Sequence, residues 1–435
     1  MERILIIDAN PYYPNTSGRV LKSYFGKTDK ERLAQFYTEN SRPTPDSCCT
    51  YFQITDAQLL KKRFNHKLCA HTIYDDNSAY EKENKPNKNS KLFSILYKLG
   101  KRNSSINYFL RKALWAKKYW WTKEFKEWID NFKPSVIVLG LSDDFYLNEI
   151  AIEISDYLNI PIIACITDDY YFNNCKKWSL FFQLYKKKIR KLIRSVFKRT
   201  SSAIYISEKM KEKYENEFKL GGEVIHPFSD FYPESELNGI NEKIKLSYFG
   251  NISLGRYKTL RLIGDSINTI GLNLELNIFT AETRKRIRNK LSKIQNTYIH
   301  EAISYEMVKK LMMESDLLLI VEDFGKKNLY WTRYSLSTKV SDSISSGIPV
   351  LAAGNPETGC IDFLKREDLC FVCGNKKELA SSILNSITNN EMRCYYHNKA
   401  AQKCKSLFSL DVTTQTFELI LQAAISKHNN QKKNI

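Results

Sequence analysis

Short apolar runs alternate with longer amphipathic stretches along most of this chain. Leu317 to Val321 is typical of the runs, because a continuous apolar segment of this length is expected of a strand that a parallel sheet buries on both faces. A helix is predicted from Thr338 to Ser346, and a second strand from Pro349 to Ala353. Ser337 carries N-cap chemistry before the helix, and Gly347 lies where a helix ends. Together they predict a strand–helix–strand unit.

Similar apolar runs predict a regular series of strands. They fall at residues 3–7, 49–54, 135–139, 162–166, 202–206, 223–226, 245–249, 274–279, 297–300 and 369–372. Amphipathic stretches between them predict helices at 19–25, 148–158, 209–217 and 412–426, and another from about 257. Strands that alternate with helices predict an α/β fold with doubly wound parallel sheets.

The chain is too long for one compact core. Its 435 residues favour two domains of about 200 residues each. A polar stretch at 229–242, which contains a proline and a glycine, is the predicted linker. The predicted domains are therefore 1–235 and 243–410, followed by a terminal helix at 411–428. The polar tail KHNNQKKNI is predicted to be disordered.

Composition places the chain among soluble globular proteins. Its residues are 43% apolar and 26% charged, and no apolar run approaches the ~20 residues needed to cross a bilayer. The N-terminus enters a strand without a charged and apolar leader, which predicts a cytoplasmic protein. Ten cysteines are scattered along the chain, and only Cys370 and Cys373 have metal-like spacing. Because neither a second pair nor a histidine cluster accompanies them, core cysteines are favoured over a zinc site, and no metal is predicted.

Two segments carry the net charge of +19. Residues 86–133 hold 12 Lys or Arg against 3 Asp or Glu, and residues 176–199 hold 10 Lys or Arg and no acid. These excesses of +9 and +10 account for the whole net charge. Both segments are also rich in aromatic residues, and from 106 to 132 the apolar positions follow helical spacing with a basic opposite face.

Three interpretations of these segments remain open. Basic amphipathic helices with Trp and Phe suit an anionic membrane surface, which we rank first. A core-facing helix with a solvated basic side ranks second. A nucleic-acid groove ranks last, since no nucleic-acid motif accompanies the charge, and no nucleic-acid partner is expected.

The predicted unit around Leu317–Ala353 has the chemistry of a phosphate site. A loop at the carboxyl end of a parallel strand leads into a helix N-terminus, where exposed N–H groups and the helix dipole favour an anion. Lys339 adds a full charge there. An ordinary capped strand–helix–strand unit, without a ligand, is the competing interpretation.

The motif S-T-K-V-x-D-x-I-x-x-G-I-P-V resembles the nucleotide-sugar site of GT-B glycosyltransferases, most nearly those of family 4 in bacterial polysaccharide assembly. The resemblance implies that Ser337, Thr338 and Lys339 face the donor diphosphate and that Asp342 binds the ribose hydroxyls. Two departures are evident: Asp342 replaces the usual Glu, and Tyr334 stands where the family has a second Glu. Glu322 is the predicted substitute, provided that the loop 323–336 folds back over the site.

The resemblance extends to residues elsewhere in the chain. It implies that Gly250 and Asn251 lie close to the donor phosphates, that Arg256 binds them, and that the main chain at Ala302 and Ile303 holds the base. Before the first helix, Gly18 ends a loop that resembles the family's loop facing the cleft. After the strand at 162–166, Asp168 matches the Asp of a family His-Asp pair, whereas Thr167 replaces the His. Asp168 or its neighbour Asp169 is thus a candidate contact for the acceptor or the donor sugar, and Asp168 and Glu322 are the catalytic candidates.

The resemblance implies two Rossmann-like domains facing a cleft, with a last helix that crosses back onto the first domain. It implies transfer of a sugar from a nucleotide-sugar donor to a lipid-linked or saccharide acceptor in polysaccharide or capsule biosynthesis. In family 4 the anomeric configuration is retained. No Asp-x-Asp motif accompanies the donor region, so basic residues would neutralise the leaving diphosphate without an obligatory metal. The alternatives are a non-catalytic GT-B-like protein that binds a membrane or a partner, and a nucleotide-sugar epimerase.

Overall fold

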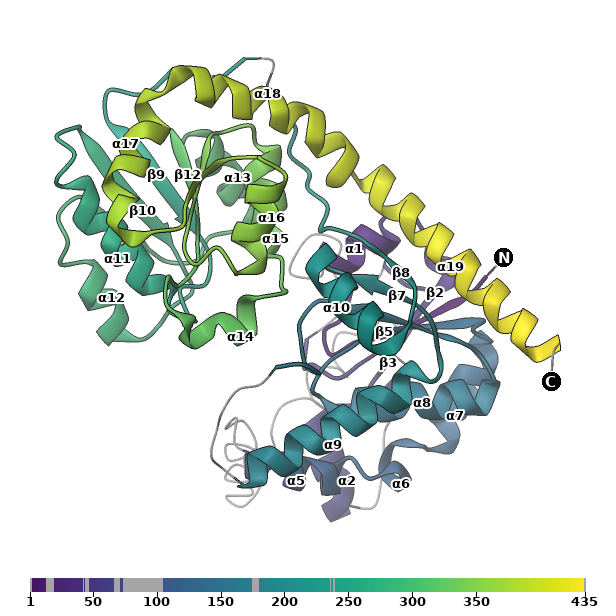
Figure 1. The fold of residues 1–435 in the computed structure, drawn as a ribbon. Coiled ribbons are helices and arrows are strands. Elements are labelled where there is room, and N and C mark those ends of the chain that lie inside the picture. The colour runs from purple at the N-terminus through teal and green to yellow at the C-terminus, as the bar shows by residue number, and fades with distance from the viewer. Residues whose placement is uncertain are drawn as a thin grey trace. The chain divides into compact units, whose positions relative to one another are not determined.

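The computed structural model describes residues 2–12, 19–41, 43, 47–65, 71–72, 105–173, 180–234, 236–237 and 239–433. It divides into two compact units. Unit 1 comprises Met1–Tyr205, Lys211–Val224 and Thr414–Ile435, and unit 2 comprises Ile206–Met210 and Ile225–Thr413. Each unit is built around its own sheet with helices packed against it (Figure 1).

Unit 1 contains an eight-stranded sheet in the order β4-β3-β2-β1-β5-β6-β7-β8. Seven of the strands run parallel, and β4 pairs antiparallel with β3 at one edge. The strands are β1 (Ile4–Ile7), β2 (Leu33–Tyr37), β3 (Thr50–Gln53), β4 (His71–Thr72), β5 (Val136–Gly140), β6 (Ile162–Ile166), β7 (Thr200–Tyr205) and β8 (Gly222–Val224). From β1 the chain adds strands on one side and then moves to β5 on the other, so the winding direction switches between β1 and β5.

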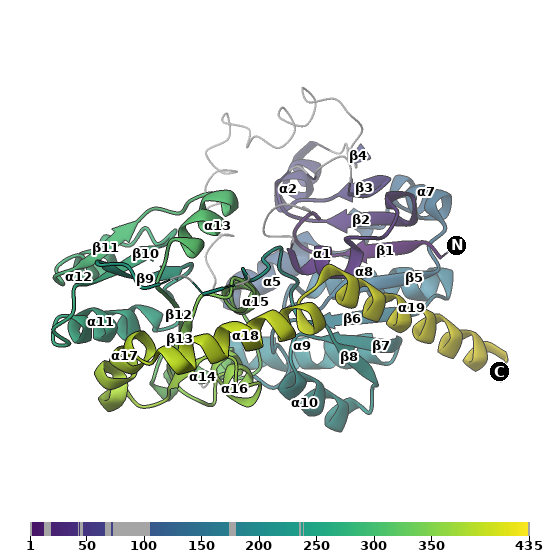
Figure 2. The same ribbon diagram turned by 90° about the horizontal axis from the view of Figure 1, so that it is seen from above.

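The helices of unit 1 connect these parallel strands, as Figure 2 shows for α7, α8 and α9. They are α1 (Arg19–Phe25), the short 3-10 helix η1 (Lys30–Arg32), α2 (Asp56–Asn65), α5 (Ser105–Leu114), α6 (Lys117–Trp120), α7 (Lys123–Phe132), α8 (Phe145–Leu158), α9 (Leu180–Phe197) and α10 (Glu208–Phe218), the first residues of which belong to unit 2.

The first basic segment packs its aromatic residues into the core of unit 1. Trp115, Trp120, Phe125 and Trp128 are buried. Trp115 stacks on Tyr146 of α8 with ring centroids 3.9 Å apart. For α6 and α7, and for Trp115 after α5, the structure therefore favours the second interpretation, a core-facing helical segment with a solvated basic side, because these rings have no surface left to offer a membrane. The predicted continuous helical spacing is also interrupted, since α5, α6 and α7 are separate helices.

The terminal helix α19 (Leu410–Lys433) crosses back onto unit 1, as predicted. Phe417 packs edge-on against Phe25 of α1, with ring centroids 4.9 Å apart. Arg32 and Glu418 form an ion pair at 2.9 Å. The prediction of a disordered tail is wrong as far as Lys433, because the helix continues and Lys432 donates a hydrogen bond to the main-chain oxygen of Asn159.

Unit 2 contains a six-stranded, fully parallel sheet in the order β11-β10-β9-β12-β13-β14. Its strands are β9 (Ile244–Phe249), β10 (Leu274–Phe279), β11 (Thr297–His300), β12 (Leu317–Val321), β13 (Val350–Ala353) and β14 (Phe371–Cys373). This is the Rossmann strand order, and the switch in winding direction falls between β9 and β12.

The helices of unit 2 cover both faces of this sheet. They are α11 (Arg256–Ile267), α12 (Lys285–Leu291), α13 (Tyr305–Met313), η2 (Lys326–Asn328), α14 (Leu329–Thr332), α15 (Thr338–Ser345), α16 (Gly359–Arg366), η3 (Lys376–Glu378), α17 (Leu379–Thr388) and α18 (Asn390–Leu407). Helices α11, α12 and α17 pack one face with residues such as Leu260, Leu291 and Ile383, and α13 lies on the opposite side (Figure 2).

The chain thus has two Rossmann-like units, as the alternation of apolar runs and amphipathic stretches predicts. The described part of the chain contains no helix with the length and apolarity needed to cross a membrane.

Candidate functional site

The candidate site lies at the carboxyl edge of the sheet in unit 2, where the winding direction switches. Gly250 and Asn251 follow β9, and Glu322 follows β12, the strand hydrogen-bonded beside it. Helices α11 and α15 begin at the same edge with Arg256 and Thr338. In open α/β sheets this is the usual place for a ligand.

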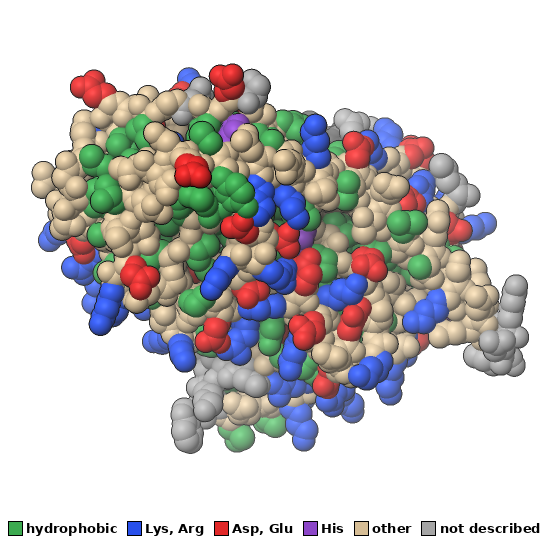
Figure 3. Space-filling view, turned by 45° about the horizontal axis from the view of Figure 1, so that its top comes forward, with side chains coloured by type: hydrophobic (Ala, Val, Ile, Leu, Met, Phe, Trp, Pro, Cys, Tyr) green, Lys and Arg blue, Asp and Glu red, His purple; other side chains and the backbone are tan. Residues whose placement is uncertain are grey.

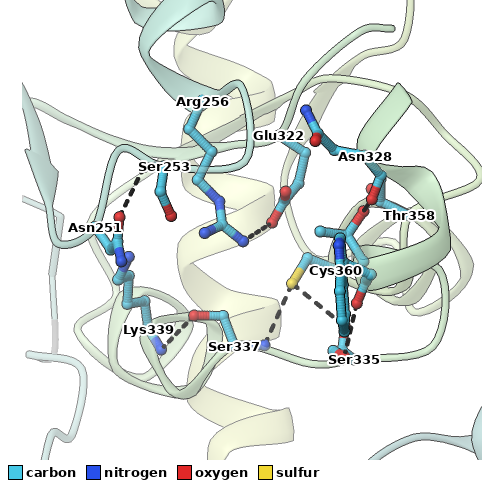
Figure 4. A network of polar contacts seen from close by, with 12 residues as sticks. Asn251, Ser253, Arg256, Glu322, Asn328, Ser335, Ser337, Lys339, Thr358 and Cys360 are labelled. Atoms are coloured by element: carbon cyan, nitrogen blue, oxygen red, sulfur yellow. Dashed lines mark hydrogen bonds and ion pairs between the residues drawn. The ribbon is translucent and has the colours of Figure 1, made fainter. Parts of the chain in front are cut away.

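Arg256 and Glu322 point toward each other across the site (Figure 4). The guanidinium Nη2 and the carboxylate Oε1 lie 2.8 Å apart, and the two side chains are 16% and 3% exposed. The second carboxylate oxygen, Oε2, is buried and has no hydrogen-bond partner. Since an unsatisfied buried oxygen is unfavourable, this atom needs a donor that the described residues do not supply.

Lys339 brings a second cation to the site. Burial, together with the nearby Arg256 guanidinium, lowers the pKa of Lys339 to about 8. Its ammonium donates to the Tyr248 hydroxyl at 3.3 Å and lies 5.0 Å from the centre of that ring. Among the described residues, no carboxylate lies within ion-pair distance of the Lys339 ammonium. A partly desolvated ammonium with only a hydroxyl partner is well suited to receive an anion.

Gly250 makes room for Lys339. Its φ of +128° lies where a side chain is strained, and a Cβ added there would fall 2.1 Å from both Cε and Nζ of Lys339. We therefore expect Gly250→Ala to displace the ammonium and to weaken binding of a diphosphate ligand about tenfold or more, the scale of losing part of a charge-assisted contact. Calorimetric titration with a nucleoside diphosphate measures this effect.

Gly271→Ala is a matched control, since Gly271 also has a positive φ but its added Cβ would meet no atom within 4 Å. If both variants bind the nucleotide alike, the close approach of Gly250 and Lys339 has no part in the site.

The start of α15 is capped as predicted. The Ser337 hydroxyl accepts a hydrogen bond from the Lys339 main-chain N–H at 3.4 Å, and Gly347, with φ of +74°, follows the end of the helix. The Ser337 N–H points to the sulfur of Cys360 at 3.3 Å. Burial raises the pKa of Cys360 to about 12, so the sulfur is a neutral thiol.

Asp342 lies one turn further along α15 and is buried. Its Oδ1 accepts hydrogen bonds from the Ser229 hydroxyl at 2.9 Å and the Tyr305 hydroxyl at 3.3 Å. These partners fix the carboxylate in position, and its contact with a ribose stays a prediction.

The loop from Asp323 to Leu336 is anchored at both ends. Asp323 accepts from Asn328 at 2.9 Å and pairs with Lys258 at 3.2 Å, so it is tied to α11. Near the other end, the main chain of Ser335 packs so closely on Gly359 that a Cβ there would lie 2.4 Å from the Ser335 oxygen. The loop therefore returns beside the site, with Ser335 close to Ser337 and Cys360 (Figure 4).

Three aromatic rings end the neighbouring strands β9, β10 and β11. Phe249 stacks on Phe279 with centroids 4.9 Å apart, and Phe279 stacks on His300 at 4.4 Å. The predicted base contacts Ala302 and Ile303 follow His300 in the next loop. The sequence alone does not predict this stack, although each ring is the last residue of its strand.

In unit 1, Asp168 and Asp169 follow β6. Asp168 is exposed, whereas Asp169 is buried and accepts from the Tyr214 hydroxyl at 3.0 Å. Burial raises the pKa of Asp169. Asp169 therefore has a structural role in holding the loop to α10, which leaves Asp168 as the ligand candidate of the pair. Gly18 lies outside the described residues.

A further acid that was not among the predicted site residues is Asp8, which follows β1 at the winding switch of unit 1. Burial raises the pKa of Asp8 to about 6, and a Cβ on Gly140 of β5 would fall 2.1 Å from its Oδ2. In the sequence, Asp8 is marked only by its position directly after the first apolar run.

The described residues contain no cluster of three or more His, Cys, Asp or Glu that could hold a metal ion. The described cysteines are free, and Cys370 and Cys373 are buried.

The structure resembles several solved glycosyltransferases. HepE from Anabaena, in complex with UDP and glucose, matches with a TM-score of 0.59 and 12% identity over 97% of this chain and all of that one. Sucrose-phosphate synthase from Thermosynechococcus elongatus matches with 0.60 and 12% over 97% of this chain and 99% of that one. A point mutant of TarM from S. aureus, in complex with Fondaparinux, alpha-GlcNAc-glycerol and UDP, matches with 0.60 and 11% over 98% and 100%.

No family model and no curated protein matches the sequence. The likeness is therefore one of structure, and it spans nearly the whole chain and nearly the whole of each neighbour. Two Rossmann-like units, the strand orders and the returning terminal helix all agree with it. The chain has the GT-B fold of glycosyltransferases.

Proposed function

We propose that this protein is a glycosyltransferase that takes a sugar from a nucleotide-sugar donor bound in unit 2. The observation that carries the proposal is the pair of cations at the winding switch, Arg256 and Lys339, with Gly250 leaving room for the Lys339 side chain. Two desolvated cations at one end of a parallel sheet favour a diphosphate. UDP is the first nucleotide to test, because HepE and TarM are both solved with UDP.

In this proposal, Arg256 and Lys339 stabilise the charge that develops on the leaving diphosphate, assisted by the N-terminus of α15 at Ser337 and Thr338. No metal is required in this account. Asp342 binds the ribose, and the main chain at Ala302 and Ile303 holds the base. Glu322 and Asp168 are the proposed contacts to the reacting sugars, and the family resemblance supports retention of configuration.

The proposed acceptor is a lipid-linked saccharide in polysaccharide or capsule assembly, presented at an anionic membrane surface. Helix α9 supports this proposal. Its buried face contains Ile189 and Ile193, whereas Leu180 is 72% exposed and Phe181 and Leu184 are also exposed. Lysines 187, 188 and 191 continue the same exposed stripe, since these positions follow Leu180 and Leu184 at helical spacing. Figure 3 shows one face of the molecule, on which basic side chains mix with acidic ones but gather along the lower margin.

The proposal predicts how nucleotide affinity depends on pH. The pKa of Lys339 is lowered to about 8, so its ammonium is lost at a lower pH than that of an ordinary lysine. Below pH 7 the charge is present, and we expect UDP affinity to fall by up to about tenfold per unit above pH 8. Calorimetry between pH 7 and 10 measures this fall. Lys339→Ala should remove the dependence, and a wild-type affinity that is flat over this range would contradict the role of Lys339.

The experiment that tests the function is incubation with a panel of nucleotide sugars, followed by measurement of the nucleoside diphosphate that is released. We expect release from one donor in the presence of membrane extract, and slow release by hydrolysis without it. A second candidate, a protein that binds a nucleotide without turnover, is favoured by Tyr334 at the usual position of the second Glu. Tight binding without any release from any donor would establish that candidate instead.

A further inference from the structure

The carboxylate of Glu322 lies beside Arg256, one of the two cations that are proposed to bind the diphosphate. Its Oε1 is held by Arg256 at 2.8 Å, and the side chain is 3% exposed. The same carboxylate acts on Lys339, whose pKa it raises against the stronger effects of burial and Arg256. One acid therefore pairs with Arg256 and acts at longer range on Lys339, the two cations that are proposed to bind the diphosphate.

The remaining oxygen, Oε2, is buried and without a hydrogen-bond partner. Donors are present nearby, but the fold directs each of them elsewhere. The Thr259 hydroxyl donates to the main-chain oxygen of Glu322 at 2.6 Å. The Lys258 ammonium and the Asn328 amide both bind Asp323. The described residues thus leave Oε2 able to accept from a ligand.

We propose that Glu322 makes the site discriminate between a sugar-bearing nucleotide and the free nucleoside diphosphate. This inference rests on the proposed function, since it concerns the same site. A free nucleoside diphosphate brings negative charge next to the Glu322 carboxylate and offers Oε2 no donor, so its binding is opposed. A nucleotide sugar carries hydroxyl groups beyond the second phosphate, and one of them donates to Oε2.

The consequence is specificity for substrate over product. A site that is built to hydrogen-bond a hydroxyl rejects ligands that lack it, because the buried polar group is then left unpaired. Glu322 thereby assists release of the nucleoside diphosphate after transfer, when the sugar hydroxyls have left.

The test compares dissociation constants of UDP and a panel of UDP-sugars for wild type, Glu322→Gln and Glu314→Gln. For wild type we expect the best UDP-sugar to bind about tenfold or more tightly than UDP, the scale of one charged hydrogen bond. For Glu322→Gln we expect UDP to bind about tenfold more tightly than to wild type and the preference for the sugar to disappear. Glu314→Gln removes one exposed acid just before the N-terminal end of β12, at the opposite end of the strand from Glu322. It should leave the dissociation constants of UDP and of the UDP-sugar unchanged.

An unchanged preference in Glu322→Gln, or no UDP-sugar that binds wild type more tightly than UDP, would overturn the inference. If Glu322→Gln does not fold, wild type alone suffices: analogues of the preferred UDP-sugar with single hydroxyls replaced by fluorine should include one that binds about tenfold more weakly. Equal affinity for all the analogues also overturns it. If wild type binds no nucleoside diphosphate and no nucleotide sugar, the proposed function itself is wrong.

Discussion

Replacing Arg256 with alanine is expected to weaken UDP binding by about 30-fold or more, which corresponds to about 2 kcal/mol for the loss of a charged phosphate contact. Lys339→Ala should have an effect of similar size for the same reason. The residues lie on different helices and meet different groups in the free protein, Glu322 and Tyr248. Because Arg256 also acts on the pKa of Lys339, the two effects are coupled, and the double variant should lose less than the product of the two single effects.

Calorimetric titration with UDP measures these affinities, and thermal unfolding checks the fold. Arg256→Ala also leaves the Glu322 carboxylate buried without its partner, so its melting temperature should fall, whereas that of Lys339→Ala should not. Arg261→Ala is the matched control, since this arginine lies on the same helix α11 but is 56% exposed and pairs with the half-exposed Asp265. Wild-type affinity in both single variants, with the fold intact, would remove the donor site from this edge of unit 2.

The second large effect concerns membrane binding through α9. Replacing Lys187, Lys188 and Lys191 with glutamine should lower binding to anionic vesicles about a hundredfold, since each lysine near such a surface contributes about 1 kcal/mol. These lysines are exposed. Their neighbours Lys186 and Arg190 are kept, because each donates to a main-chain oxygen of the loop after β6.

Sedimentation with vesicles measures this binding. Wild type should sediment with anionic but not with neutral vesicles, and salt should reverse it in part. Replacing Leu180, Phe181 and Leu184 with serine should remove the salt-resistant part. Replacing the exposed Lys285, Lys290 and Lys293 of unit 2 with glutamine lowers the net charge by the same amount and should leave binding to vesicles unchanged. Equal sedimentation with both kinds of vesicle, or none with either, would mean that the basic charge of α9 has another purpose.

The sequence predicts best the strands that have a continuous apolar pattern. The strands β6 and β12 begin and end at the predicted residues, because uninterrupted apolar runs mark central parallel strands. The strands β10 and β11 also have the predicted bounds, although apolar and polar residues alternate in β10 and β11 lies at the edge of its sheet. The strand β2 is missed, because Gln35 interrupts its run. In the structure Gln35 is fully buried, and its amide binds the main chain of Asn10 and Tyr12. The polar Gln35 inside β2 is thus explained by the loop at Asn10 and Tyr12 that it supports, and the sequence of the strand does not show this loop.

Amphipathic pattern alone does not show what a basic helix faces. The spacing at 106–132 is helical, but the burial of Trp115 depends on Tyr146, which lies 31 positions later. By contrast, the exposed apolar residues of α9 keep the membrane interpretation open for the second segment.

Some residues of the candidate site can also be predicted from the local sequence, and others cannot. The sequence around α15 predicts Ser337, Lys339 and Gly347, since helix caps and terminal glycines, and the residues beside them, are determined by a few neighbouring positions. The contacts of the site depend instead on strands that are adjacent in space. Arg256 and Glu322 are 66 positions apart, and their ion pair follows from the proximity of β9 and β12.

The central claim is that unit 2 binds a nucleoside diphosphate through its second phosphate. The most direct test is calorimetric titration of the wild-type protein with UDP, UMP and uridine at pH 7. Arg256 and Lys339 should make UDP bind about 30-fold or more tightly than UMP, and UMP more tightly than uridine. Equal affinities for UDP and UMP, or no binding of UDP or of any other nucleoside diphosphate, would contradict the account.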